Sequence, residues 1–184
     1  AFRLMRSTIL LVGRSHGTYP SGRGMTRSTG SPRCAGMAGM DVGALLLELY
    51  GRIPPLVEEA VGGLEAGHLA QRPTLEANSI GWLVWHLARV QDHHVAEILD
   101  VPQVWAGGGW AERFGLDPDP SNTGYGHSSA DVAAVRPESA AALTGYLAAV
   151  DARTRTMLAG LAPDDLDRVV DRAWDPPVTL GVRL

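Results

Sequence analysis

Three histidines, His86, His93 and His94, share one predicted helix and are the side chains best suited to bind a metal ion or transfer a proton. His86 and His93 are about 20° apart around the helix, but at a rise of about 1.5 Å per residue they lie about 10 Å apart along it. These two side chains therefore cannot hold one metal ion by themselves. His94 lies near the centre of the apolar stripe of this helix, which consists of Ile80, Leu83, Leu87, Val90, His94 and Ile98. A metal ion at His86 would need ligands from another helix.

A histidine near the apolar face of a helix is also commonly a packed side chain, bonded to a backbone carbonyl or to a hydroxyl group. Spacing alone does not separate this structural interpretation from a role as a ligand. His93 has the weakest claim, because it lies toward the wetter side of the helix beside Arg89. His127 belongs to a glycine-rich run in a long loop, where it either lines the mouth of a pocket or is solvated.

Capping residues and prolines define the helices that must position these side chains. The helix of the three histidines is predicted over residues 79–99, with Asn78 or Ser79 as its N-cap. Before it, Asp41 caps a first helix over residues 42–64, which must kink or restart at Pro54 and Pro55. Residues 65–78 are predicted to form a connecting loop.

A long loop separates the second helix from a third. Residues 100–134 are rich in proline and glycine and carry one short helical candidate at residues 110–116. Pro137 fits the first turn of the third helix, which ends at Pro163. A short helical turn is predicted within residues 164–174, and Thr179 is a candidate cap for a further helix. The pattern predicts an all-α, up-and-down four-helix bundle, with tryptophans in its core and at its rim.

The charge and the single cysteine restrict the classes of partner and site. Residues 41–184 contain ten arginines and all twenty acidic residues, a formal charge of 10 − 20 = −10. Such an acidic body without a basic stripe excludes nucleic acid as the partner. Cys34 alone allows neither an internal disulfide nor a cysteine-based zinc site, so metal ligands would be histidines and carboxylates. We expect a cytoplasmic protein that binds a small molecule and does not enter a membrane.

Residues 1–39 differ in composition from the rest of the chain. They are rich in glycine, serine and arginine and contain no acidic residue. Their one apolar run, residues 9–12, is too short for a membrane span or a secretory signal. We expect a disordered or non-native extension ahead of a natural start at Met37 or Met40, followed by one domain over residues 40–184.

The run NSIGWLVWHLARVQD at residues 78–92 resembles the second helix of the DinB-like superfamily. It looks closest to the actinobacterial branch called domain of unknown function 664, which is related to the mycothiol-dependent maleylpyruvate isomerase metal-binding domain. The likeness continues in order through FGLDPDP at residues 114–120, GYGH at 124–127 and WDPPVTLGVRL at 174–184. Together with the proline-containing first helix, the resemblance covers residues 40–184.

The resemblance implies a four-helix bundle that holds one divalent metal ion, zinc or nickel, between a histidine of the second helix and two ligands of the fourth. His86 matches that histidine, and His94 is the other candidate ligand on the same helix. Relatives of this branch use the metal with a low-molecular-weight thiol such as mycothiol, because coordination makes the thiol a thiolate at neutral pH. Tyr125 and His127 would then contact the second substrate.

Two functions remain open. The first is a metal-dependent, thiol-using transferase or isomerase, and the alternative is a non-catalytic helical protein that binds a small molecule or a partner. Because the fourth helix would begin only at residues 179–184, we expect this chain to lack the remaining ligands and to be inactive as it stands. We also expect it to form a homodimer through apolar stripes that the fourth helix would cover. The catalytic side chains are not assigned.

Overall fold

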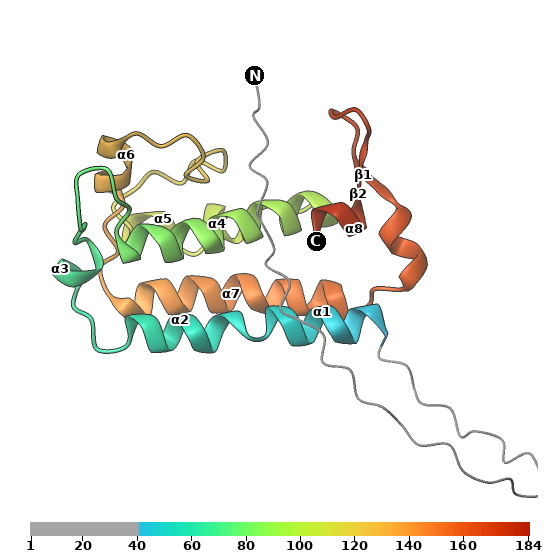
Figure 1. The fold of residues 1–184 in the computed structure, drawn as a ribbon, viewed down its shortest axis with the longest axis horizontal. Coiled ribbons are helices and arrows are strands. Elements are labelled where there is room, and N and C mark those ends of the chain that lie inside the picture. Colours follow the sequence, from blue (N-terminus) through green and yellow to red (C-terminus); the bar gives the residue numbers. More distant parts are fainter. Residues whose placement is uncertain (1–40) are drawn as a thin grey trace, which may run out of the picture. The chain divides into compact units, whose positions relative to one another are not determined.

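The computed structural model describes residues 41–184 and shows a mostly helical fold (Figure 1). Three helical columns make up its body: α1 (Val42–Tyr50) with α2 (Ile53–Val61), α4 (Ile80–Leu99), and α7 (Ala140–Ala159). α7 packs against α4 and against both α1 and α2. The predicted all-α class is confirmed. The extension predicted over residues 1–39 lies outside the described residues.

The first column is interrupted where the sequence predicts. Asp41 caps α1, and its Oδ1 accepts a hydrogen bond of 2.6 Å from the backbone N–H of Ala44. α1 ends at Tyr50, and α2 begins with Pro54 and Pro55 in its first turn, where a missing N–H removes no helical hydrogen bond. The predicted break at the prolines is therefore confirmed.

α4 begins as predicted but buries a different face from its apolar stripe. Ser79 is the N-cap, and its Oγ accepts a hydrogen bond of 3.1 Å from the N–H of Trp82. Leu83 and Leu87, both members of the stripe, are 51% and 36% exposed. Arg89, predicted on the wetter side, is fully buried instead. The buried face consists of Gly81, Trp82, Val84, Trp85, Ala88, Arg89, Asp92, Val95 and Ala96.

The loop between α4 and α7 carries more structure than the sequence predicts. The expected short helix is α5 (Trp110–Arg113), and it is joined by a 3₁₀ turn, η1 (Val104–Ala106), and by α6 (Ser129–Ala134). A reciprocal capping box between Ser128 and Asp131 starts α6, a signal that the sequence carries. α3 (Ala66–Leu69) likewise interrupts the predicted loop before α4.

The predicted place of Pro137 in the first turn of the third helix is wrong. α7 begins at Ala140, and Ser139 is its N-cap. Pro137 is buried against α4 at Gly81, where an added Cβ would lie 2.8 Å from the proline Cγ. The proline therefore serves close packing between the loop and α4.

The chain after α7 forms a small hairpin. η2 (Pro163–Asp167) supplies the expected helical turn, and β1 (Val169–Asp171) then pairs antiparallel with β2 (Val178–Thr179). Thr179 is the N-cap of α8 (Leu180–Arg183), as predicted. Residues 41–184 do not test the rest of the predicted fourth helix. Within the same residues, no helix is long and apolar enough to cross a membrane.

Aromatic side chains fill the core between α4, α7 and the loop. The ring of Trp105 lies 6.0 Å from that of Trp85, 5.7 Å from Phe114 and 5.4 Å from Tyr146, measured between ring centroids. Trp85 and Trp105 are fully buried, whereas Trp174 is exposed. This cluster fixes the loop against the two long helices.

Candidate functional site

A pocket of about 380 Å³ lies between the end of α1, the exposed stripe of α4, and α8. Its walls are apolar over much of their area because α4 contributes Leu87, Val90, Val95 and Ile98. The polar groups that line it are Tyr50, His86, Gln91, His94 and Arg183. A neighbouring hollow of about 320 Å³ shares His86, Val90 and His94 and adds His93, Thr123 and Tyr125. The predicted ligands His86 and His94 thus line the same two cavities.

His86 presents an unprotonated ring nitrogen. Its Nδ1 lies 2.6 Å from the carbonyl oxygen of Thr123, and a carbonyl can only accept, so Nδ1 carries the proton of the neutral ring. Nε2 then holds a lone pair, and it makes no hydrogen bond within residues 41–184. The ring also stacks on Trp82, with centroids 4.6 Å apart. A bond from Nδ1–H to a carbonyl is the arrangement that orients a histidine for ligation through its other nitrogen.

Gly124 allows the loop to come this close to α4. Its φ of +90° is unfavourable for other residues. A Cβ at this position would lie 2.8 Å from Nδ1 of His86, 2.9 Å from the ring of Trp85 and 3.1 Å from the ring of Trp82. The carbonyl of Thr123 reaches His86 because the next residue has no side chain.

His94 has the opposite proton arrangement. Its Nδ1 lies 2.8 Å from Nη1 of Arg183, and a guanidinium can only donate, so Nδ1 accepts and Nε2 carries the proton. Burial and the charge of Arg183 lower the pKa of His94, while Glu97 opposes the shift. His94 is therefore neutral at pH 7 and offers no free lone pair in this arrangement.

His93 is engaged on both sides of its ring. Nδ1 lies 3.0 Å from the amide nitrogen of Gln103, and Nε2 lies 3.4 Å from a carboxylate oxygen of Glu97. The amide donates to Nδ1, so Nε2–H faces the carboxylate. This pairing favours the structural interpretation of His93.

The two predicted substrate contacts lie in different surroundings. Tyr125 is 83% exposed and lines the smaller hollow beside His86. His127 is outside both linings, and its Nδ1 accepts a hydrogen bond of 3.1 Å from Nε1–H of Trp82. Its Nε2 lies 2.8 Å from Oδ1 of Asn122. Burial lowers the pKa of His127, and Asp131 partly opposes this shift.

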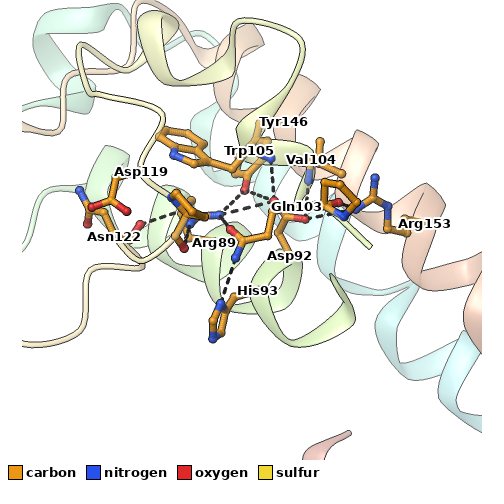
Figure 2. Close-up of polar contacts among 12 residues, drawn as sticks. Arg89, Asp92, His93, Gln103, Val104, Trp105, Asp119, Asn122, Tyr146 and Arg153 are labelled. Atoms are coloured by element: carbon orange, nitrogen blue, oxygen red, sulfur yellow. Dashed lines mark hydrogen bonds and ion pairs between the residues drawn. The ribbon is translucent and has the colours of Figure 1, made fainter. Parts of the chain in front are cut away.

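A buried polar cluster that the sequence pattern did not predict lies next to His93 (Figure 2). Arg89 donates from Nε to the carbonyl of Asn122 and from Nη2 to that of Pro120, both at 3.0 Å. Its Nη1 bonds to Oε1 of Gln103 at 2.8 Å and to the hydroxyl of Tyr146 at 3.2 Å. The fully buried guanidinium is thereby surrounded by acceptors.

Asp92 balances the charge of Arg89, with 3.5 Å between the two groups. Its carboxylate accepts hydrogen bonds from the N–H groups of Val104 and Trp105, at 2.9 and 2.8 Å. The hydroxyl of Tyr146 donates to it at 2.8 Å, and burial raises the pKa of Tyr146 far above its usual value. A sequence signal for the cluster existed, because Arg89 and Asp92 are three residues apart on the helix face of Trp82 and Trp85.

The residues of 41–184 do not form a complete metal centre. They contain no group of three or more histidine, cysteine, aspartate or glutamate side chains that could hold a metal ion. His86 fits one ligand position through Nε2, whereas Arg183 occupies Nδ1 of His94 and adds a positive charge beside the pocket. A metal bound at His86 would need donor atoms from outside this part of the chain.

Comparisons with known proteins relate most of the helical region to one family. A family model described as the DinB superfamily matches residues 50–183. Among solved structures, the chain is similar to a conserved protein from Enterococcus faecalis, with 30% sequence identity and a TM-score of 0.71. That match covers 79% of this chain and 85% of the other chain. The curated proteins contain no match.

Proposed function

Because the chain belongs to the DinB superfamily, we propose that its functional site is the pocket beside His86 and that Nε2 of His86 is the reactive atom there. The observation that carries this proposal is the 2.6 Å contact between Nδ1 and the carbonyl of Thr123, which leaves Nε2 unprotonated. The resemblance of residues 78–92 to the second DinB helix independently selects the same side chain.

The finer proposal is a metal-dependent transferase or isomerase that uses a low-molecular-weight thiol such as mycothiol. His86 would be one ligand of a divalent ion, zinc or nickel, and Tyr125 would contact the second substrate at the smaller hollow. The remaining ligands would have to come from outside residues 41–184. The thiol cosubstrate would supply a thiolate that residues 41–184, which contain no cysteine, do not provide.

A second candidate is non-catalytic binding of a small apolar molecule. The apolar wall of Leu87, Val90 and Val95 favours it, as does the contact between His94 and Arg183 that occupies a ring nitrogen. Replacing Val90 with Trp should fill the pocket and abolish binding of an apolar fluorescent dye such as 1-anilinonaphthalene-8-sulfonate. Undiminished dye binding would contradict this second function.

Calorimetric titration with Zn²⁺ tests the metal proposal. We expect weak binding at one site, because one ring nitrogen is free among the described ligands. His86→Ala should abolish this binding. His68→Ala is the matched control, since His68 is exposed on α3, and it should bind Zn²⁺ as the unchanged protein does.

Three outcomes would contradict the metal proposal as stated. Unchanged binding in His86→Ala would move the site to His94, and no detectable binding in the unchanged protein would leave the apolar-ligand function. A tight stoichiometric site would show that the described residues do complete a metal centre, against the arrangement of His94 and Arg183.

A further inference from the structure

We propose that Arg89 is a positioning residue that fixes which nitrogen of His86 carries the proton. It acts through the loop segment 120–124, which it holds against α4 (Figure 2). The importance of the free Nε2 rests on the function proposed above, whereas the positioning itself is a property of the protein without any ligand.

The guanidinium of Arg89 donates hydrogen bonds to two backbone carbonyls of the loop. Nε binds the carbonyl of Asn122 and Nη2 that of Pro120, while Nη1 is taken by Gln103 and Tyr146. Each of the three nitrogens has its own acceptor. The planar fork of arginine fits this arrangement, and the single ammonium nitrogen of lysine does not.

The bond from Arg89 to the Asn122 carbonyl lies one residue before the contact with His86. Thr123 follows Asn122 directly, and its carbonyl oxygen is the partner of Nδ1 at 2.6 Å. Asp119 stabilises the turn that precedes Asn122. Its Oδ1 accepts hydrogen bonds of 2.8 and 2.7 Å from the N–H and the hydroxyl of Ser121. Arg89 thus fixes the loop one residue before the carbonyl that accepts from His86, and the N–H of Thr123 donates to the Ser121 carbonyl at 3.0 Å.

Asp92 anchors an earlier part of the same loop between α4 and α7. Its carboxylate holds the N–H groups of Val104 and Trp105, and it provides the countercharge for Arg89. The guanidinium also lies 4.9 Å from the ring centroid of Trp105. Two parts of the loop, at residues 104–105 and at residues 120–122, are thus tied to two side chains one turn apart on α4.

Loss of the hydrogen bonds from Arg89 to the loop would change which nitrogen of His86 carries the proton. Without the Thr123 carbonyl, nothing described in residues 41–184 holds the proton on Nδ1 of His86. A neutral imidazole in water favours the proton on Nε2. The two tautomers would then interconvert, and Nε2 would lose its lone pair for much of the time.

Long-range ¹H–¹⁵N NMR correlations of the histidine rings test this proposal, at about pH 8.5, above the ordinary histidine pKa of about 6.5. In the unchanged protein, His86 should be protonated on Nδ1. Arg89→Lys should give a mixture of tautomers at His86. Arg113→Lys is the matched control, because Arg113 bonds to Glu138 away from the pocket, and it should leave His86 as it was.

A folded Arg89→Lys variant that keeps His86 protonated on Nδ1 would overturn the proposal. If this variant does not fold, Gly124→Ala decides, because its Cβ would lie 2.8 Å from Nδ1 of His86 and must push the loop and His86 apart while Arg89 is intact. Mixed tautomers in Gly124→Ala support the route through the loop, and an unchanged His86 contradicts it. Neither result depends on Zn²⁺, so failure of the metal proposal remains distinguishable.

Discussion

His86 and His94 face the same pocket from one helix, yet their partners give them opposite proton arrangements. A carbonyl oxygen accepts from Nδ1 of His86, and a guanidinium donates to Nδ1 of His94. The side chain alone does not decide which histidine offers a lone pair on Nε2. The hydrogen-bond partner of Nδ1 decides whether Nε2 has a lone pair.

The sequence could place these histidines on one helix face but could not rank them by chemistry. The partner of His86 is 37 residues away, and that of His94 is 89 residues away. Helical periodicity carries no information about either contact. The resemblance of residues 78–92 to the DinB-like family selected His86, and the importance of Arg89 was hidden because a charged residue counts as exposed in any periodicity argument.

His127 predicts a dependence of stability on pH. Burial lowers its pKa in the folded protein, so the unfolded chain takes up the proton first as the pH falls below about 6.5. The stabilising contribution is complete above that value and is lost toward lower pH. The urea midpoint of the unchanged protein should therefore fall more between pH 7.5 and 5.5 than that of His127→Gln.

His68→Gln is the control for this comparison, because His68 is exposed, and it should lose stability with pH as the unchanged protein does. The lowered pKa of His94 acts in the same direction, but it is present in all three proteins. Equal losses in His127→Gln and the unchanged protein would contradict the burial argument.

At the scale of elements, the caps and the break at Pro54 and Pro55 were predictable, whereas the place of Pro137 and the buried face of α4 were not. Asp41 and Ser79 start their helices through local side-chain bonds, which short sequence patterns record. The face of α4 depends on the loop, because carbonyls at residues 120 and 122 satisfy Arg89 and permit its burial. The strands β1 and β2 are three and two residues long, too short for a visible alternation.

Two glycines provide a matched test of how α4 packs. A Cβ at Gly81 would lie 2.8 Å from the carbonyl oxygen of Leu69 and from Cγ of Pro137, whereas a Cβ at Gly67 meets nothing within 4 Å. Gly81→Ala should lower the free energy of unfolding by about 1–3 kcal/mol through overpacking. Gly67→Ala, on helix α3, should be neutral or slightly stabilising.

Urea unfolding followed by tryptophan fluorescence gives both values. Similar stability of the two alanine variants would show that the loop before α4 and Pro137 move aside freely. The close packing described here would then be wrong.

At the scale of the whole molecule, large apolar side chains remain exposed on both columns that flank the pocket. They are Leu45, Leu49 and Leu56 on α1 and α2, and Leu83 and Leu87 on α4. Apolar surface of this kind favours association. We therefore expect sedimentation velocity to show a dimer whose fraction rises with protein concentration.

The double change Leu49→Glu and Leu87→Glu should weaken this association. Leu75→Glu, in an exposed loop before α4, is the control and should leave it unchanged. A monodisperse monomer at every concentration, with or without these changes, would contradict the expectation.

The tautomer of His86 in the unchanged protein decides whether Nε2 can be the reactive atom of the pocket. The direct measurement is the ¹⁵N spectrum of its ring at about pH 8.5, above the ordinary histidine pKa. We predict an unprotonated Nε2 on His86 and, in the same spectrum, a protonated Nε2 on His94. A protonated Nε2 on His86 would contradict the assignment of this atom as the reactive group of the pocket.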